Sequence, residues 1–176
     1  SSLPTGLLYG NVGVSTLSGR PIDLEVTNTS LYRPWKLIRN GLNGEFAQIN
    51  LDAPKDNAGE DLNYVTLRFR FLDSESGEPA VLVRFRLTFF DFDEGTDGRA
   101  RECFATKGFT HIQLGGSSTQ IRDAIDPIDP SFTTLCSSQY GVLSDNPTEP
   151  FSLTDHQQSK AVEVVYMETS EVQMRF

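Results

Sequence analysis

The chain has 176 residues, of which 38% are hydrophobic, and its mean hydropathy is -0.32; these values are typical of a globular domain with a core, and of neither a membrane protein nor a disordered chain. Its net charge of -9 disfavours nucleic acid as a partner, because Lys and Arg side chains supply most of the affinity for a phosphate backbone. No apolar run approaches the roughly 20 residues that a membrane-spanning helix needs. We therefore expect one domain over residues 1–176, with no membrane insertion.

Short alternating segments predict β-strands in the first part of the chain. Residues 7–14 are typical of an opening strand with glycines at bends. Residues 22–27 and 46–51 alternate apolar and polar side chains, as half-buried strands do. The spacing of an amphipathic helix is missing from the sequence, apart from a turn near residues 119–124.

The segment after the second strand carries a glycosylation triplet and two aromatic residues. Asn28, followed by Thr29 and Ser30, would accept an N-glycan in a secreted eukaryotic protein. Tyr32 and Trp35 would together form a platform on which a sugar ring stacks. A lone Trp in a β protein more often packs in the core or at its rim, so both interpretations stay open.

The strongest pattern predicts a β-hairpin, with strands over residues 65–71 and 81–89 and a turn between them. One face of each strand is apolar. The other face carries four arginines, namely Arg68, Arg70, Arg84 and Arg86. Like charges on one face destabilise a sheet, so something must compensate them. The candidates are an acidic segment of the chain, such as residues 123–130, or an acidic ligand: a polysaccharide or the surface of a neighbouring subunit.

A run of carboxylates follows the 81–89 strand directly. If the alternation continues, Asp91 and Asp93 face the core, where an unpartnered carboxylate is costly. The strand could end, a β-bulge could shift its register, or a cation or Arg could neutralise the charge. For calcium, the candidate ligands are Asp91, Asp93, Asp97 and Glu102. The spacing is not that of an EF-hand, and an acidic, solvated loop with internal salt bridges is the alternative.

Cys103 and Cys136 are the only cysteines, and we expect a disulfide between them. The acidic, Ser/Thr-rich composition fits an extracellular setting, whereas two free thiols would fit the cytosol. A bridge would stabilise the fold by roughly 3–4 kcal/mol in the chain-entropy model. Residues 109–114, 161–167 and 172–176 complete the predicted strands, and the proline-punctuated region 123–156 is expected to be irregular.

Many short strands with regular turn signals predict an antiparallel β-sandwich, of jelly-roll or immunoglobulin-like type. Residues 89–95 read Phe-Phe-Asp-Phe-Asp-Glu-Gly, and residues 98–103 read Gly-Arg-Ala-Arg-Glu-Cys. This stretch resembles the strand–loop segment of secreted β-sandwich domains in algal, protist and bacterial surface proteins. The resemblance covers about a tenth of the chain and implies an extracellular binding or structural module.

We therefore expect a secreted or cell-surface domain with a structural or protein-interaction role in a larger assembly, stabilised by calcium at residues 91–102. Its partners would be other protein subunits or an acidic polysaccharide. The first alternative is a carbohydrate-binding module that uses Trp35, Tyr32 and the arginine face. The second is a hydrolase-like jelly roll with Asp91 and Asp93 as paired carboxylates. Catalysis is not expected, since the sequence has neither a Gly-x-Ser-x-Gly elbow nor a Gly-Lys-Ser/Thr phosphate loop.

Overall fold

A computed structural model describes residues 6–52, 63–95, 100–116, 118–142, 144 and 146–176. In this part of the chain the larger sheet has seven strands, in the order β1 (Gly6–Val14), β2 (Pro21–Asn28), β5 (Thr66–Asp73), β12 (Glu171–Arg175), β7 (Cys103–Thr106), β10 (Thr133–Ser137) and β9 (Ile121–Ala124). The smaller sheet has three, in the order β6 (Leu82–Phe89), β11 (Val162–Thr169) and β8 (His111–Leu114). The remaining elements are the hairpin of β3 (Gly41–Asn43) and β4 (Phe46–Gln48), the 3-10 helix η1 (Leu37–Arg39) and the helix α1 (Asp155–Ser159).

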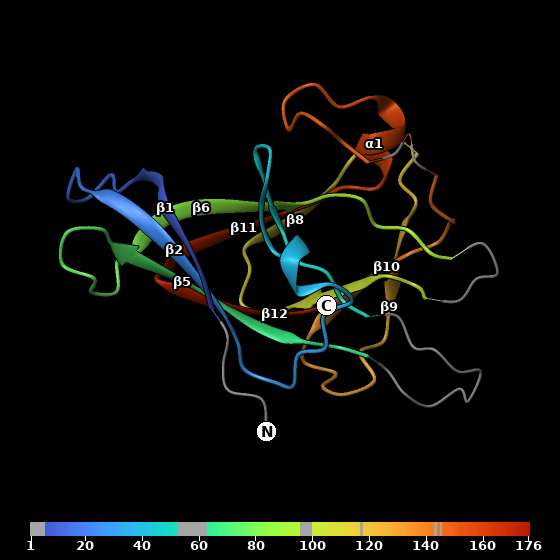
Figure 1. Ribbon diagram of the computed structural model, residues 1–176, viewed down its shortest axis with the longest axis horizontal. Coiled ribbons are helices and arrows are strands. Elements are labelled where there is room, and N and C mark those ends of the chain that lie inside the picture. The colour runs from blue at the N-terminus through green and yellow to red at the C-terminus, as the bar shows by residue number, and fades with distance from the viewer. Residues whose placement is uncertain (1–5, 53–62, 96–99, 117, 143, 145) are drawn as a thin grey trace.

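The two sheets pack face to face and enclose one hydrophobic core (Figure 1). Aromatic rings join them: Phe71 of β5 lies 4.4 Å from Phe85 of β6 between ring centroids, and Phe104 of β7 lies 4.8 Å from Phe89 of β6. Burying a ring of this size contributes roughly 1.5–3 kcal/mol. Strands pair antiparallel throughout the two sheets. This confirms the antiparallel β-sandwich predicted from the sequence.

The alternation in β2, β5 and β11 explains how the core is closed. Alternate side chains of these strands belong to the core: Ile22, Leu24 and Val26 in β2, Leu67, Phe69 and Phe71 in β5, and Val162, Val164 and Tyr166 in β11. Val165 of β11 is buried as well. The hydroxyl of Tyr166 would be costly in such a place without a partner. It hydrogen-bonds across the core to the hydroxyl of Thr106 in β7, which is also fully buried.

The predicted hairpin of residues 65–89 is wrong, although both of its strands exist. β5 pairs with β2 and β12, whereas β6 pairs with β11 in the other sheet. Only an isolated bridge between Leu72 and Pro79 joins the two strands near their turn. Strict alternation shows that a strand is half-buried, but it does not show which strand lies beside it. The chain crosses from one sheet to the other here.

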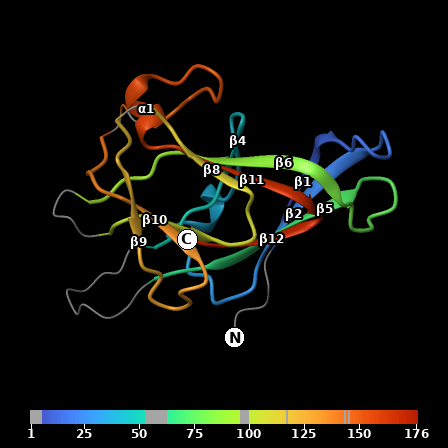
Figure 2. The same ribbon diagram turned by 180° about the vertical axis from the view of Figure 1, so that it is seen from behind.

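The ends of β6 and the region 123–156 also differ from expectation. Val81 and Val83 are exposed, and Leu82 between them packs against the core. Region 123–156 is not irregular throughout, because it contains β10, and the helical turn expected near residues 119–124 is instead strand β9. Figure 2 shows α1, β9 and β10 together at one end of the molecule, with β1 and β2 at the other. No helix in the described ranges is long and apolar enough to cross a membrane.

Candidate functional site

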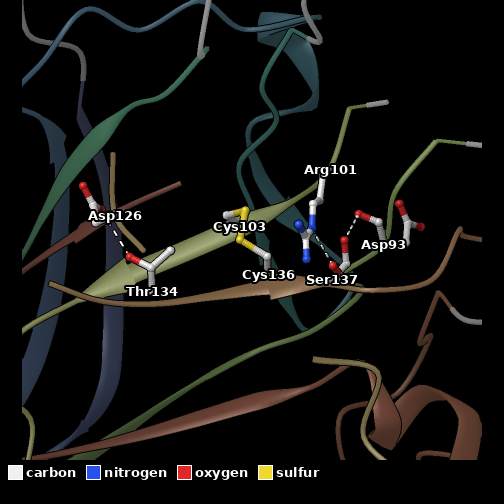
Figure 3. The surroundings of a disulfide bond; sticks show 7 residues. All are labelled: Asp93, Arg101, Cys103, Asp126, Thr134, Cys136 and Ser137. Atoms are coloured by element: carbon white, nitrogen blue, oxygen red, sulfur yellow. Dashed lines mark hydrogen bonds between the residues drawn. A yellow bond between two sulfur atoms is a disulfide. The ribbon is translucent and has the colours of Figure 1, made fainter. Parts of the chain in front are cut away.

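A disulfide joins Cys103 of β7 to Cys136 of β10, as the sequence predicted. The two residues are direct partners in the antiparallel ladder, so the bridge reinforces a pair of strands that already share hydrogen bonds. Figure 3 shows the polar contacts that continue from it toward the end of the strands. Ser137 donates its hydroxyl to the carbonyl of Asp93 at 2.7 Å, and Arg101 Nε donates to the carbonyl of Ser137 at 2.7 Å. The bridge thus fixes β10 beside the acidic segment.

The acidic segment keeps its carboxylates out of the core because β6 ends at Phe89. Asp91 then takes a left-handed backbone conformation, with φ at 66°. The register changes there, and Phe92 enters the core, where its ring centroid lies 6.3 Å from that of Phe104. Of the three solutions considered for Asp91 and Asp93, the structure uses the first: the strand stops before them.

Asp93 and Glu102 face each other across the segment. The backbone N–H of Asp93 donates to Glu102 Oε2 at 3.3 Å, and the N–H of Glu102 donates to the Asp93 carbonyl at 3.0 Å. Burial of its carboxyl group, followed by the charge of Asp93, raises the pKa of Glu102 to about 8. The residue as a whole is exposed. Above about pH 8, where Glu102 ionises, these carboxylates repel one another.

A buried lysine offsets part of that repulsion. Lys160 is fully buried after α1, donates Nζ to the Tyr140 carbonyl at 3.2 Å, and its charge acts to lower the pKa of Glu102. The sequence analysis missed this residue. Its nearest signal was the capping box of α1, Thr154 with Gln157, which both make the expected hydrogen bonds. That motif places the end of a short helix next to Lys160, but it says nothing about burial.

The acidic segment holds the four candidate calcium ligands. Asp91, Asp93 and Glu102 lie in the described ranges, whereas Asp97 falls outside them. Among described side chains, no three of His, Cys, Asp or Glu are grouped so that they could hold a metal ion. Calcium at residues 91–102 therefore stays a prediction.

The four arginines do not form one face, which corrects the interpretation of a shared ligand surface. Arg68 and Arg70 lie on the outer face of the seven-stranded sheet, and Arg84 and Arg86 lie on the outer face of the three-stranded one. Three of them pair with glutamates: Arg70 with Glu25 at 2.8 Å, Arg68 with Glu171 at 3.8 Å and Arg86 with Glu163 at 3.4 Å. The compensation is internal, but it comes from neighbouring strands and not from residues 123–130.

Tyr32 packs against the core, whereas Trp35 lies at the surface. The Tyr32 hydroxyl donates to the Asn50 carbonyl at 2.7 Å and accepts from Asn40 Nδ2 at 2.6 Å, so it anchors the segment before η1. Trp35 is 52% exposed. Lys36 Nζ and Arg39 Cζ lie 4.2 and 4.9 Å from the centroid of its ring. A sugar that stacked on Trp35 would have to compete with these cations.

Asn28 is a poor glycan acceptor where the structure places it. Its side chain is 8% exposed, and Nδ2 donates to the Ser30 carbonyl at 2.9 Å. It lines a small pocket of about 190 Å³, together with Gly6, Leu7, Val26, Tyr32, Leu37, Asn40, Ile49 and Leu67. A glycan would need this amide to leave the pocket wall.

An exposed apolar surface lies beside this pocket. We call it the 31–42 patch, and its exposed apolar members are Leu31, Trp35, Leu37, Ile38 and Leu42. Ile38, at 93% exposure, has almost no contact with the rest of the chain. Large apolar side chains grouped on a surface mark interaction sites far more often than scattered ones do.

No protein-family model matches the chain, and no curated protein matches it in sequence. The resemblance of residues 89–103 to secreted β-sandwich domains therefore stays an expectation. What the chain does has to be argued from its surfaces and its chemistry.

Proposed function

We propose that this protein is a secreted or cell-surface β-sandwich domain that acts by binding other proteins within a larger assembly. The 31–42 patch carries the proposal, because it places five large apolar side chains in solvent within twelve consecutive positions. Trp and Arg, which are enriched at the centres of protein interfaces, both occur in it as Trp35 and Arg39. The Cys103–Cys136 bridge supports an oxidising compartment.

Site-specific photo-crosslinking tests this role. A photoreactive amino acid at Ile38 should give covalent adducts with other protein chains on the surface of the source cells or in their surroundings. Gln173, an exposed position of β12 outside the patch, provides the control. Adducts from position 38 alone support the proposal. Equal adducts from both positions, or none from position 38, would contradict it.

A carbohydrate-binding module is the second candidate, and the exposure of Trp35 is the observation in its favour. Glycan-array or affinity-gel binding that is lost in Trp35→Ala would support it. The cations over the Trp35 ring and the division of the arginines between two sheets weigh against a large sugar-binding face. Acidic polysaccharide is the competing partner, and its binding should be tested beside that of protein partners.

We further propose that calcium strengthens the acidic segment. Asp91, Asp93 and Glu102, together with Asp97, would contribute carboxylate oxygens, the ligand type that calcium prefers. Burial and then the charge of Asp93 raise the pKa of Glu102, and a divalent cation there would relieve the second of these effects. A catalytic role for Asp91 and Asp93 is not part of the proposal.

A further inference from the structure

We propose that the protein that binds the 31–42 patch is a second copy of this chain, and that its acidic loop (residues 123–129) docks there. This inference rests on the proposed function and names the partner. The patch supplies cations and apolar side chains, and the acidic loop supplies carboxylates and two exposed isoleucines. Each surface is complementary to the other and not to itself.

The patch is the basic part of an acidic protein. Residues 31–44 contain Arg33, Lys36 and Arg39 and no Asp or Glu, although the chain has 24 acidic residues. The rest of the chain is consequently more acidic than the net charge of -9 indicates. A second copy therefore offers the patch an oppositely charged surface, which favours encounter in the right orientation.

The acidic loop holds its apolar side chains out in solvent. Ile125 is 88% exposed and Ile128 is 44% exposed, and they alternate with Asp123, Asp126 and Asp129. Asp126 is turned inward and binds Arg175, so the carboxylates of Asp123 and Asp129 are the ones near the surface. Asp129 Oδ2 also lies 3.7 Å from Lys107 Nζ. This surface ion pair is weak, so Asp129 can bind a cation of the patch in place of Lys107.

The loop is rigid before any partner binds. Asp126 Oδ1 accepts hydrogen bonds from the N–H groups of Ile128 and Asp129, both at 2.8 Å, and Asp126 Oδ2 accepts one from the Thr134 hydroxyl at 3.3 Å. Pro127 and Pro130 restrict the backbone further. A loop that is already ordered loses little conformational entropy on docking, which favours binding.

The pocket beside the patch fits an aliphatic side chain. Leu37 belongs to both, so the pocket opens at the edge of the patch. Its polar lining groups are engaged within the chain: Asn40 with Tyr32 and Asn50, and Asn28 with Ser30. A side chain that enters the pocket therefore makes apolar contacts there and no new hydrogen bonds. An isoleucine such as Ile125 satisfies this requirement better than a sugar, whose hydroxyls would lose water without replacement.

Sedimentation velocity of the disulfide-bonded chain, over a range of concentrations at low and high NaCl, tests the proposal. We expect concentration-dependent association that weakens at high salt. Ile125→Asp in the loop, or Ile38→Asp with Lys36→Glu in the patch, should each weaken it by roughly tenfold or more. Phe151→Asp is the matched control, because Phe151 is 95% exposed and lies outside both surfaces. All these positions are exposed, and equal melting temperatures would show that the variants fold.

Mixing the two defective variants gives the decisive result. The loop of the patch variant and the patch of the loop variant are both intact, so the mixture should form a one-to-one heterodimer while each variant alone stays monomeric. Failure of the mixture to associate would overturn the proposal, as would association of Ile125→Asp with wild-type strength, or a wild-type chain that stays monomeric throughout.

Two further outcomes separate this proposal from the proposed function. If heparin or polygalacturonate binds wild type and Ile125→Asp equally but not the patch variant, while no self-association occurs, the patch serves a polyanion and the self-association proposal fails. If the chain stays monomeric but Ile38 crosslinks to other proteins, self-association fails and the proposed function stands. If the chain stays monomeric and Ile38 gives no crosslinks to other proteins, both the self-association proposal and the proposed function fail.

Discussion

Asp126 and Arg175, which are 49 positions apart, form a salt bridge in which Arg175 Nη1 lies 2.6 Å from Asp126 Oδ1. Their side chains are only 2% and 12% exposed. The Arg175 guanidinium also lies over the ring of Phe132, at 4.8 Å from the centroid. This contact ties the loop that carries Ile125 to the last strand of the sandwich, and so links the stability of the fold to the presentation of the loop.

Asp126→Asn should destabilise the protein by about 3 kcal/mol, because it leaves the charge of Arg175 nearly buried and without its partner. Asp123→Asn removes a carboxylate of the same loop that is exposed, and should change stability by less than about 0.5 kcal/mol. Urea unfolding of the two variants beside wild type measures the difference. Equal stability of the two variants would show that the bridge contributes nothing.

The pH dependence of stability should report the same bridge. Burial alone would raise the pKa of Asp126, but the N–H groups of Asp129 and Ile128 and the charge of Arg175 outweigh it and lower the pKa. The unfolded chain then binds this proton at higher pH than the folded chain does. The stabilisation is therefore complete above about pH 4 and is lost as the pH falls through the folded pKa. Melting temperatures of wild type and Asp126→Asn should converge on acidification; a constant gap would contradict this.

The sequence predicted most of the strands, because alternation of apolar and polar residues follows directly from burial of one face. β2, β5, β11 and β12 lie within a residue or two of their expected positions. The sequence could not predict their partners. β5 and β6 are adjacent in the chain, yet they belong to different sheets, and the four arginines are separated for that reason.

The candidate site was predictable to a smaller extent. The Cys103–Cys136 pairing followed from having only two cysteines in the chain. The roles of Lys160 and Arg175 depend on contacts between segments that are distant in sequence, and single charged residues near a strand give no sign of burial. Within the 31–42 patch the sequence drew attention to Trp35 and Tyr32 but not to Leu37 and Ile38. Exposure of Leu37 and Ile38 is a property of the fold and not of any local pattern.

Loss of the disulfide should cost roughly 3–4 kcal/mol, since the bridge restricts the unfolded chain across the segment between β7 and β10. The paired variant Cys103→Ser with Cys136→Ser should show this loss in urea, without a large change in the folded structure. Alkylation of protein from its source before any reduction, followed by intact-mass measurement, tests the bridge itself. Two alkylated thiols would exclude it and would also remove a support for extracellular location.

Gly115→Ala should destabilise the protein by about 1–3 kcal/mol, because a Cβ there would approach the Gln158 carbonyl oxygen to 1.9 Å and backbone atoms cannot rotate away. Gly13→Ala is the matched control, since a Cβ at that position in β1 meets nothing within 4 Å. Thermal unfolding of both variants decides the point. If Gly115→Ala has the same melting temperature as wild type, α1 is free to shift away from β8.

Calcium should raise the melting temperature of metal-stripped protein, and EDTA should reverse the gain. Above about pH 8 the folded chain holds Glu102 ionised close to Asp93, so a divalent cation can relieve the repulsion between the two carboxylates. The same pKa shift means that the folded state binds the Glu102 proton more tightly than the unfolded state. Stability without metal should therefore fall as the pH rises from about 4.5 toward 8.

Two variants separate the metal effect from the repulsion itself. Glu102→Gln should melt higher than wild type in EDTA at alkaline pH, and the gain should vanish at pH values where Glu102 is protonated in both states. Asp93→Asn should abolish the difference between melts with calcium and with EDTA, because it removes a carboxylate from the set. Identical wild-type melts with and without calcium would reject the metal, while a stabilising Glu102→Gln would still confirm that the folded state disfavours the ionised Glu102 carboxylate.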